Sequence, residues 1–160
     1  MTSQSIAIRR GGLDDVAALA PLFDAYRRFY EQPADLARAQ AWLQARLESG
    51  ESVVFVAEEA DAAADRPRLV GFCQLYLTWC SVALAPIAVL YDLFVDDRAR
   101  RGGVGRALML MAQAWAGEAG LARLDLSTAH DNVRAQALYE SLGWQRDAVF
   151  RTYSLPLAAA

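Results

Sequence analysis

One segment of the 160-residue chain, residues 90–108, constrains the fold more than any other. It reads LYDLFVDDRARRGGVGRAL, an apolar run followed by a turn of arginine and glycine and then by an amphipathic helical pattern. A strand that passes through a glycine turn straight into a helix is typical of α/β proteins. The first N–H groups of a helix have no intrahelical partner, and the helix dipole adds positive potential there. The segment therefore predicts a backbone site for a phosphate group.

Two common nucleotide-binding loops do not fit this turn. A P-loop ends in Gly-Lys-Ser/Thr, whereas Arg106 and Ala107 follow Gly105 here. A dinucleotide-binding fingerprint needs a third small residue where Leu108 stands. The pattern that remains is Arg-x-x-Gly-x-Gly, formed by Arg100, Gly103 and Gly105. The alternative interpretation is a plain glycine turn beside a solvated arginine cluster.

Composition excludes several other chemistries. Hydrophobic residues make up 55% of the chain, which is enough for a core, and the length predicts one domain over residues 1–160. All 16 basic residues are arginine and His130 is the single histidine, so a lysine Schiff base and a multi-histidine zinc site are excluded. A net charge of −3 argues against nucleic acid as a partner. We find no signal-peptide pattern and no apolar run of membrane-spanning length, which predicts a cytoplasmic protein with no membrane partner.

Hydrophobic periodicity predicts the remaining elements. Helices are expected at residues 13–29, 34–49, 104–119 and 132–142. Strands are expected at residues 5–9, 52–58, 69–79, 87–95, 123–127, 144–147 and 150–155. Because strands and helices alternate only in part, the predicted class is mixed α/β, with a mainly antiparallel central sheet flanked by helices.

A second motif, HDNVRAQALYESLGW at residues 130–144, supports the first. It is similar to the pattern Asn-x-x-Ala-x-x-Leu-Tyr-x-x-x-Gly-Phe, with Asn132, Ala135, Leu138, Tyr139 and Gly143 in register. Together the two motifs resemble the GNAT superfamily (GCN5-related N-acetyltransferases), whose members bind acetyl-CoA in the arginine and glycine loop. The segment YDLFV and the ending YSLP also resemble the branch that holds yeast histone, polyamine and D-amino-acid acetyltransferases.

The resemblance implies the acyl-CoA N-acyltransferase fold and an activity. The activity is acetyl-CoA-dependent transfer of an acetyl group to a primary amine of a small molecule, amino acid or peptide, by direct attack in a ternary complex. A non-catalytic acyl-CoA-binding module of the same fold is the alternative, and the fold often forms homodimers. The residues implied to hold acetyl-CoA are Leu93, Phe94, Val95, Arg100, Arg101, Gly102, Gly103, Val104, Gly105, Arg106 and Asn132.

The resemblance also implies catalytic roles. The strand around Leu93 and Phe94 would separate from its neighbour and offer a backbone N–H to the thioester carbonyl. Tyr139 is the candidate acid for the leaving thiolate, although it fits a core aromatic as well. Asp92 is the first candidate for the base, and Glu58, with Glu59 beside it, is the alternative; each could instead be a solvated carboxylate. The candidate acceptor-binding residues are Tyr26, Phe29, Tyr30, Trp79, Ser127 and Thr128.

Overall fold

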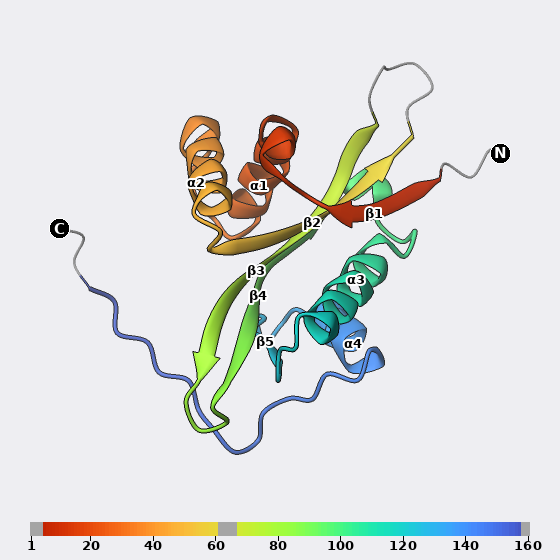
Figure 1. Ribbon diagram of the computed structural model, residues 1–160. Coiled ribbons are helices and arrows are strands. Elements are labelled where there is room, and N and C mark those ends of the chain that lie inside the picture. The colour runs from red at the N-terminus through yellow and green to blue at the C-terminus, as the bar shows by residue number, and fades with distance from the viewer. Residues whose placement is uncertain (1–4, 61–66, 158–160) are drawn as a thin grey trace. The chain divides into compact units, whose positions relative to one another are not determined.

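The computed structural model describes residues 5–60 and 67–157 (Figure 1). The chain divides into two compact units, Met1–Ser127 and Thr128–Ala160, and each is described here by itself.

The first unit is built on a five-stranded sheet in the order β1-β2-β3-β4-β5. Neighbouring strands are antiparallel except for β4 and β5, which run parallel, so the predicted mixed, mainly antiparallel sheet is confirmed. The strands are β1 (Ile6–Arg10), β2 (Ser52–Glu59), β3 (Arg68–Cys80), β4 (Ala85–Val95) and β5 (Leu124–Leu126). The helices are α1 (Val16–Phe29), α2 (Leu36–Glu48) and α3 (Val104–Glu118), with short 3-10 turns at Leu13–Asp15 and Asp97–Ala99. The five strands and three α-helices lie within a few residues of their predicted positions, whereas the turn at Asp97–Ala99 was not predicted.

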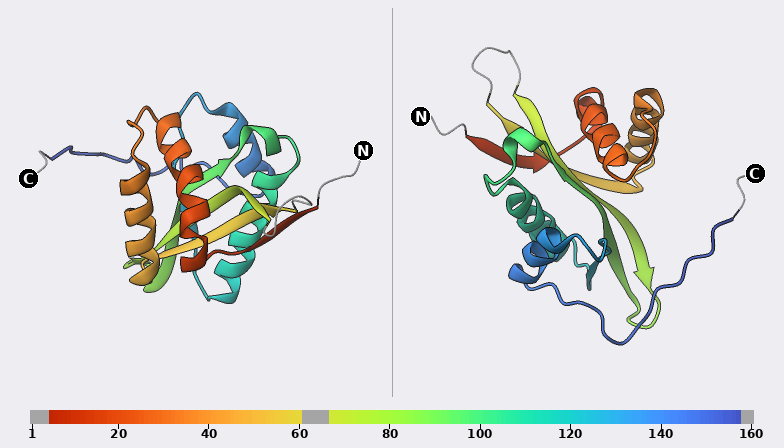
Figure 2. Two further views of the ribbon diagram at one scale, coloured as in Figure 1. Left: turned by 90° about the horizontal axis from the view of Figure 1, so that it is seen from above. Right: turned by 180° about the vertical axis from the view of Figure 1, so that it is seen from behind.

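Helices cover both faces of this sheet. Figures 1 and 2 show α1 and α2 on one face and α3 on the other. The α1 and α2 face buries a core that includes Leu19, Phe23, Leu43 and Phe72, because the apolar positions of both helices recur at helical spacing. Burial on this face positions Phe23 of α1 and Trp42 of α2 beside β3 and β4.

Gly71 on β3 lets α3 approach the sheet closely. A Cβ atom at this position would lie 3.0 Å from the carbonyl oxygen of Phe94 and 3.4 Å from methyl groups of Leu108 and Val104. Only glycine leaves that space empty. The start of α3 is therefore held against the end of β4, and both belong to the segment of residues 90–108.

The second unit contains α4 (Val133–Ser141), which Asn132 caps by accepting a hydrogen bond from the N–H of Ala135 at 3.3 Å. Gly143, at a φ of 89°, ends the helix in the left-handed region.

The two strands predicted at residues 144–147 and 150–155 are wrong, because this segment forms no strand. A strand needs a partner for its backbone groups. Here the Asp147 carboxylate accepts the N–H groups of Val149 and Phe150 at 2.8 and 2.9 Å, which makes a local turn instead. The apolar side chains that suggested strands are exposed, Tyr153 at 86% and Leu155 at 83%.

Candidate functional site

A β-bulge in β4 shapes the site. Leu75 on β3 pairs with Leu90, but the next residue back, Gln74, pairs with Asp92, so Tyr91 is an extra residue on β4. In a regular strand, consecutive side chains point to opposite faces. The bulge breaks this rule and brings Tyr91 and Asp92 to the same cavity.

Beyond the bulge, one edge of β4 is open. The parallel pairing with β5 covers only Ala88–Leu90, so among the described residues no strand partner follows for the rest of β4 on that side. The N–H of Asp96 donates to the carbonyl of Val70 at 2.8 Å, and hydrogen-bonded pairs alternate along an antiparallel ladder. This alternation turns the backbone groups of Phe94 toward β3 and those of Leu93 and Val95 toward the open edge. The outward N–H groups beyond the β5 pairing therefore belong to Leu93 and Val95, whereas the N–H of Phe94, named with Leu93 in the prediction, faces β3.

The chain leaves this edge through the predicted turn and enters α3. Two residues of the turn lie in the left-handed region, Arg101 at a φ of 70° and Gly103 at 79°. Gly103 is the N-cap of α3 and offers no capping side chain, and the first helical hydrogen bond is that of the Ala107 N–H to the Gly103 carbonyl. The N–H groups of Val104, Gly105 and Arg106 thus begin the helix without a side-chain cap, which is the arrangement that binds anions.

Arg100 has a local role in this geometry. Its Nε donates to the carbonyl of Val95 at 2.9 Å, and its guanidinium lies 5.7 Å from the ring centre of Phe94 and pairs with Asp97. Arg100 therefore fixes the end of β4. Arg101, Gly102, Gly103 and Arg106 are exposed in the turn and the first helical turn, as a loop that meets a charged ligand requires.

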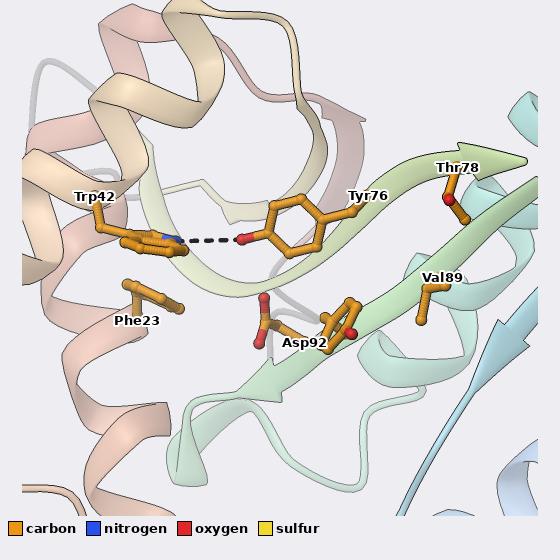
Figure 3. Close-up of a pocket in the computed structure, with 7 residues that line it drawn as sticks. Phe23, Trp42, Tyr76, Thr78, Val89 and Asp92 are labelled. Atoms are coloured by element: carbon orange, nitrogen blue, oxygen red, sulfur yellow. Dashed lines mark hydrogen bonds between the residues drawn. The ribbon is translucent and has the colours of Figure 1, made fainter. Parts of the chain in front are cut away.

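A cavity of about 570 Å³ opens on the α1 and α2 face of the same strand. Figure 3 shows the Asp92 carboxylate directed into the space between Phe23, Trp42 and Tyr76. The lining residues come from α1, α2, β3 and β4 and are Phe23, Trp42, Tyr76, Thr78, Val89, Tyr91 and Asp92. This volume is in the range of small-molecule sites.

Asp92 is the one ionisable carboxyl in that lining. It is only 8% exposed, and Gln74 donates an amide hydrogen bond to its Oδ2 at 2.8 Å. Burial raises the pKa of Asp92 above its ordinary value, and hydrogen bonds from Gln74 and Tyr26 lower it in part. Buried carboxyls with a raised pKa are better proton acceptors near neutral pH than ordinary ones.

Glu58, the alternative base, has a different environment. Its Oε2 accepts a hydrogen bond from Nε of Arg9 at 2.9 Å, and Arg9 also pairs with Asp15 at 2.8 Å. These contacts join β2, β1 and the turn that begins α1. Glu58 does not line the cavity, and the β-ladder places it four residues along β2 from Val54, the partner of Gln74. Four strand residues span about 13 Å.

None of the predicted acceptor residues is in the lining of the cavity. Tyr26 packs against Phe72 and Phe94, and its hydroxyl lies 3.0 Å from the Tyr91 carbonyl oxygen and also bonds the Asp92 carboxyl, so it holds both residues of the bulge. Phe29, Tyr30 and Trp79 are exposed and do not line it, and Ser127 is exposed after β5. The residues that sequence reasoning missed are Phe23, Trp42, Tyr76, Thr78, Val89 and Tyr91. A signal existed for two of them, because Gln74, Tyr76 and Thr78 alternate with leucine or tryptophan along β3.

Three predicted residues belong to the second unit. Asn132 caps α4, and Thr128 is half-buried before it. Tyr139 lies on α4, with its ring centre 6.2 Å from that of Trp144. The assignments of these three residues remain predictions.

Comparisons with known proteins agree with these features. The family model described as the acetyltransferase (GNAT) family matches residues 18–144. The uncharacterized N-acetyltransferase YhfO of Bacillus subtilis (strain 168) is 44% identical over 95% of this chain and 98% of its own length. A crystal structure of a probable acetyltransferase is 37% identical, with a TM-score of 0.88, and covers 96% of this chain and 99% of the other. A D-amino-acid N-acetyltransferase of Saccharomyces cerevisiae is 34% identical over half of each chain.

Within residues 5–60 and 67–157, no helix has the length and apolar character that crossing a membrane requires.

Proposed function

The chain belongs to the acetyltransferase (GNAT) family and is an N-acetyltransferase, and from this premise we propose that it transfers the acetyl group of acetyl-CoA to a primary amine by direct attack in a ternary complex. The observation that carries the proposal is the continuous path from the open edge of β4 through the glycine turn to the uncapped start of α3. A thioester supplies an activated acetyl group, and the path offers backbone N–H groups along its length. Membership of a family of acetyltransferases also disfavours the alternative of a non-catalytic acyl-CoA-binding module.

The residues of this path fit the parts of acetyl-CoA. The backbone of Val95 would pair with an amide of the pantetheine arm as an added strand does. The N–H groups of residues 101–106 would bind the pyrophosphate, where Gly103 removes the side chain from a left-handed position. Arg101 and Arg106 add positive charge in a protein whose net charge is −3. Asn132 would contact the pantetheine arm of acetyl-CoA.

Leu93 and Asp92 would act on the two sides of the reacting carbon. The outward N–H of Leu93 would donate to the thioester carbonyl oxygen and stabilise the negative charge that develops there, an effect of about 3–4 kcal/mol in other acyl transfers. An alkylammonium with a pKa near 10 is almost fully protonated at neutral pH, so the amine must lose a proton before it attacks. Asp92 would take that proton, because its raised pKa suits the role and its carboxylate faces the cavity.

Tyr139 would donate a proton to the departing thiolate. Removal of its hydroxyl should therefore lower turnover without weakening the binding of acetyl-CoA. We expect Tyr139→Phe to lower kcat by about 10²-fold or more, with an unchanged Kd for acetyl-CoA. An unchanged kcat would mean that Tyr139 only packs against its neighbours and that water protonates the thiolate.

The binding half of the proposal is tested by thermal shift with acetyl-CoA. Gly103→Glu should abolish the shift, because it adds a negative charge and a side chain where the pyrophosphate lies. The matched control is Gly50→Glu, since Gly50 has a φ of 69° and open space around it, as Gly103 does, but follows α2. The control should lose stability by a similar amount and keep the shift. Equal shifts in the two variants would contradict the assignment of the turn.

A further inference from the structure

The cavity beside Asp92 has one charged group and a wall of aromatic rings. Asp92 is the one lining residue with a charge, and four of the other six are aromatic, namely Phe23, Trp42, Tyr76 and Tyr91. An ammonium group that enters would meet a carboxylate and the negative faces of rings, which attract cations. The rest of an acceptor would meet rings and the side chains of Thr78 and Val89.

The rings are fixed before any acceptor arrives. The indole N–H of Trp42 donates to the hydroxyl of Tyr76 at 3.2 Å, which ties α2 to β3 across the cavity (Figure 3). The rings of Tyr76 and Tyr91 meet edge to face, with centres 5.3 Å apart. Arg46 stacks on Trp42 with its guanidinium 4.8 Å from the ring centre and pairs with Glu51. A wall held in this way loses little conformational entropy when a flat group binds to it.

The charge count limits what an acceptor can carry. A second ammonium would find no second carboxylate in the lining, and a carboxylate would enter beside Asp92 with no cationic side chain in the lining to pair with it. Arg46, the cation that contacts the wall, is engaged with Trp42 and Glu51. The cavity is open on one side, where Trp42 and Tyr91 are 46% and 62% exposed, so a second charge would gain no partner in the lining and would lose part of its hydration against the rings.

We propose that this cavity selects a primary amine with a single positive charge, joined by a short linker to a flat, uncharged aromatic group. The ammonium lies at Asp92, and the aromatic group lies against Trp42 and Tyr76. This inference rests on the proposed function, since it assigns the acceptor of the same reaction.

The test compares acceptors at saturating acetyl-CoA, with release of the CoA thiol as the readout. The panel contains 2-phenylethylamine, phenylalanine, which adds a carboxylate, spermidine, which adds positive charges, and ethylamine, which lacks the ring. We expect 2-phenylethylamine to have a kcat/KM at least about tenfold above each of the other three.

Two variants assign the preference to the wall. Trp42→Ala should lower kcat/KM for 2-phenylethylamine by about tenfold more than it lowers kcat/KM for ethylamine. Leu77→Ala is the control, because Leu77 is 47% exposed, as Trp42 is at 46%, and lies on β3 outside the lining. It should leave the ratio of the two substrates unchanged.

The outcomes separate this inference from the function beneath it. If acetyl-CoA gives no thermal shift and no amine releases thiol, the proposed function fails. If amines are acetylated but phenylalanine, spermidine or ethylamine equals 2-phenylethylamine, or Trp42→Ala preserves the ratio, the inference is overturned and the function stands. If acetyl-CoA binds but none of the four amines is acetylated, both this inference and the proposal of a primary amine as the acceptor are overturned.

Discussion

Replacement of Gly71 by alanine tests whether the approach of α3 to the sheet builds the acetyl-CoA path. The added Cβ would lie 3.0 Å from the Phe94 carbonyl oxygen, a backbone atom that cannot rotate away. Overpacking of this kind costs about 1–3 kcal/mol. Alanine also restricts the unfolded chain, which returns about 0.4–1 kcal/mol. The net loss of about 1–2 kcal/mol corresponds to a fall in Tm of roughly 2–8 °C for a chain of this size.

The matched control is the same substitution at Gly117, on α3. Its Cβ would meet nothing within 4 Å and its φ is not in the left-handed region, so the substitution adds helix propensity alone. We expect a gain of about 0.5–1 kcal/mol and a rise in Tm of roughly 1–4 °C. Two identical substitutions are thus predicted to move Tm in opposite directions.

The assay is a thermal melt of each variant with and without acetyl-CoA. Because the clash is with the Phe94 carbonyl, it should displace β4 between Leu93 and Val95 and reduce the acetyl-CoA shift of Gly71→Ala, while Gly117→Ala keeps the full shift. A Gly71→Ala protein that melts at or above the parent temperature would refute the packing argument. A less stable variant with a full acetyl-CoA shift would refute the link from packing to binding.

Three further substitutions follow from local geometry. Asp92→Asn removes a buried carboxyl group whose pKa is raised by burial, so the parent protein loses stability as the pH rises through that folded pKa. The variant should have the same Tm as the parent near pH 4 and a higher Tm at pH 7. A lower Tm of the variant at pH 7 would count against the burial argument. Glu58→Gln breaks the pair with Arg9 and should lower Tm by about 2–4 °C without altering the pH–rate profile, whereas a changed profile would restore Glu58 as a base. Arg101→Gly removes the backbone strain of an arginine in the left-handed region, so it should raise Tm by about 2–4 °C and weaken the binding of acetyl-CoA. A lower Tm in melts without acetyl-CoA would contradict the strain.

The segment of the proposed cofactor path was predictable because its fold depends on local rules. The strand, the glycine turn and the helix at residues 90–108 follow from apolar periodicity and from residues that tolerate a left-handed backbone. The C-terminal strands were predicted by the same periodicity and are absent. Asp147 supplies a local acceptor for the N–H groups of Val149 and Phe150, which a count of apolar residues does not register.

The proposed acceptor cavity was only partly predictable because tertiary pairing assembles it. Asp92 was predicted as the base from its place on the strand that would bear the proposed thioester site. Trp42 and Tyr76 were not, because 34 residues separate them and only the packing of α2 over β3 brings their hydrogen bond together. The aromatic residues predicted in their place, Phe29 and Tyr30, are at the exposed end of α1.

The bulge at Tyr91 explains how one strand could serve both proposed substrates. With strict alternation, Tyr91, Leu93 and Val95 would share one face of β4, and Asp92 would point to the opposite face. The extra residue lets Tyr91 and Asp92 line the same cavity, while the ladder beyond it still turns the N–H groups of Leu93 and Val95 to the open edge. The pairing with β5 also ends at Leu90, directly before the bulge. A single inserted residue therefore places the proposed base beside the backbone amide that would hold the thioester, a juxtaposition that no periodicity in the sequence reveals.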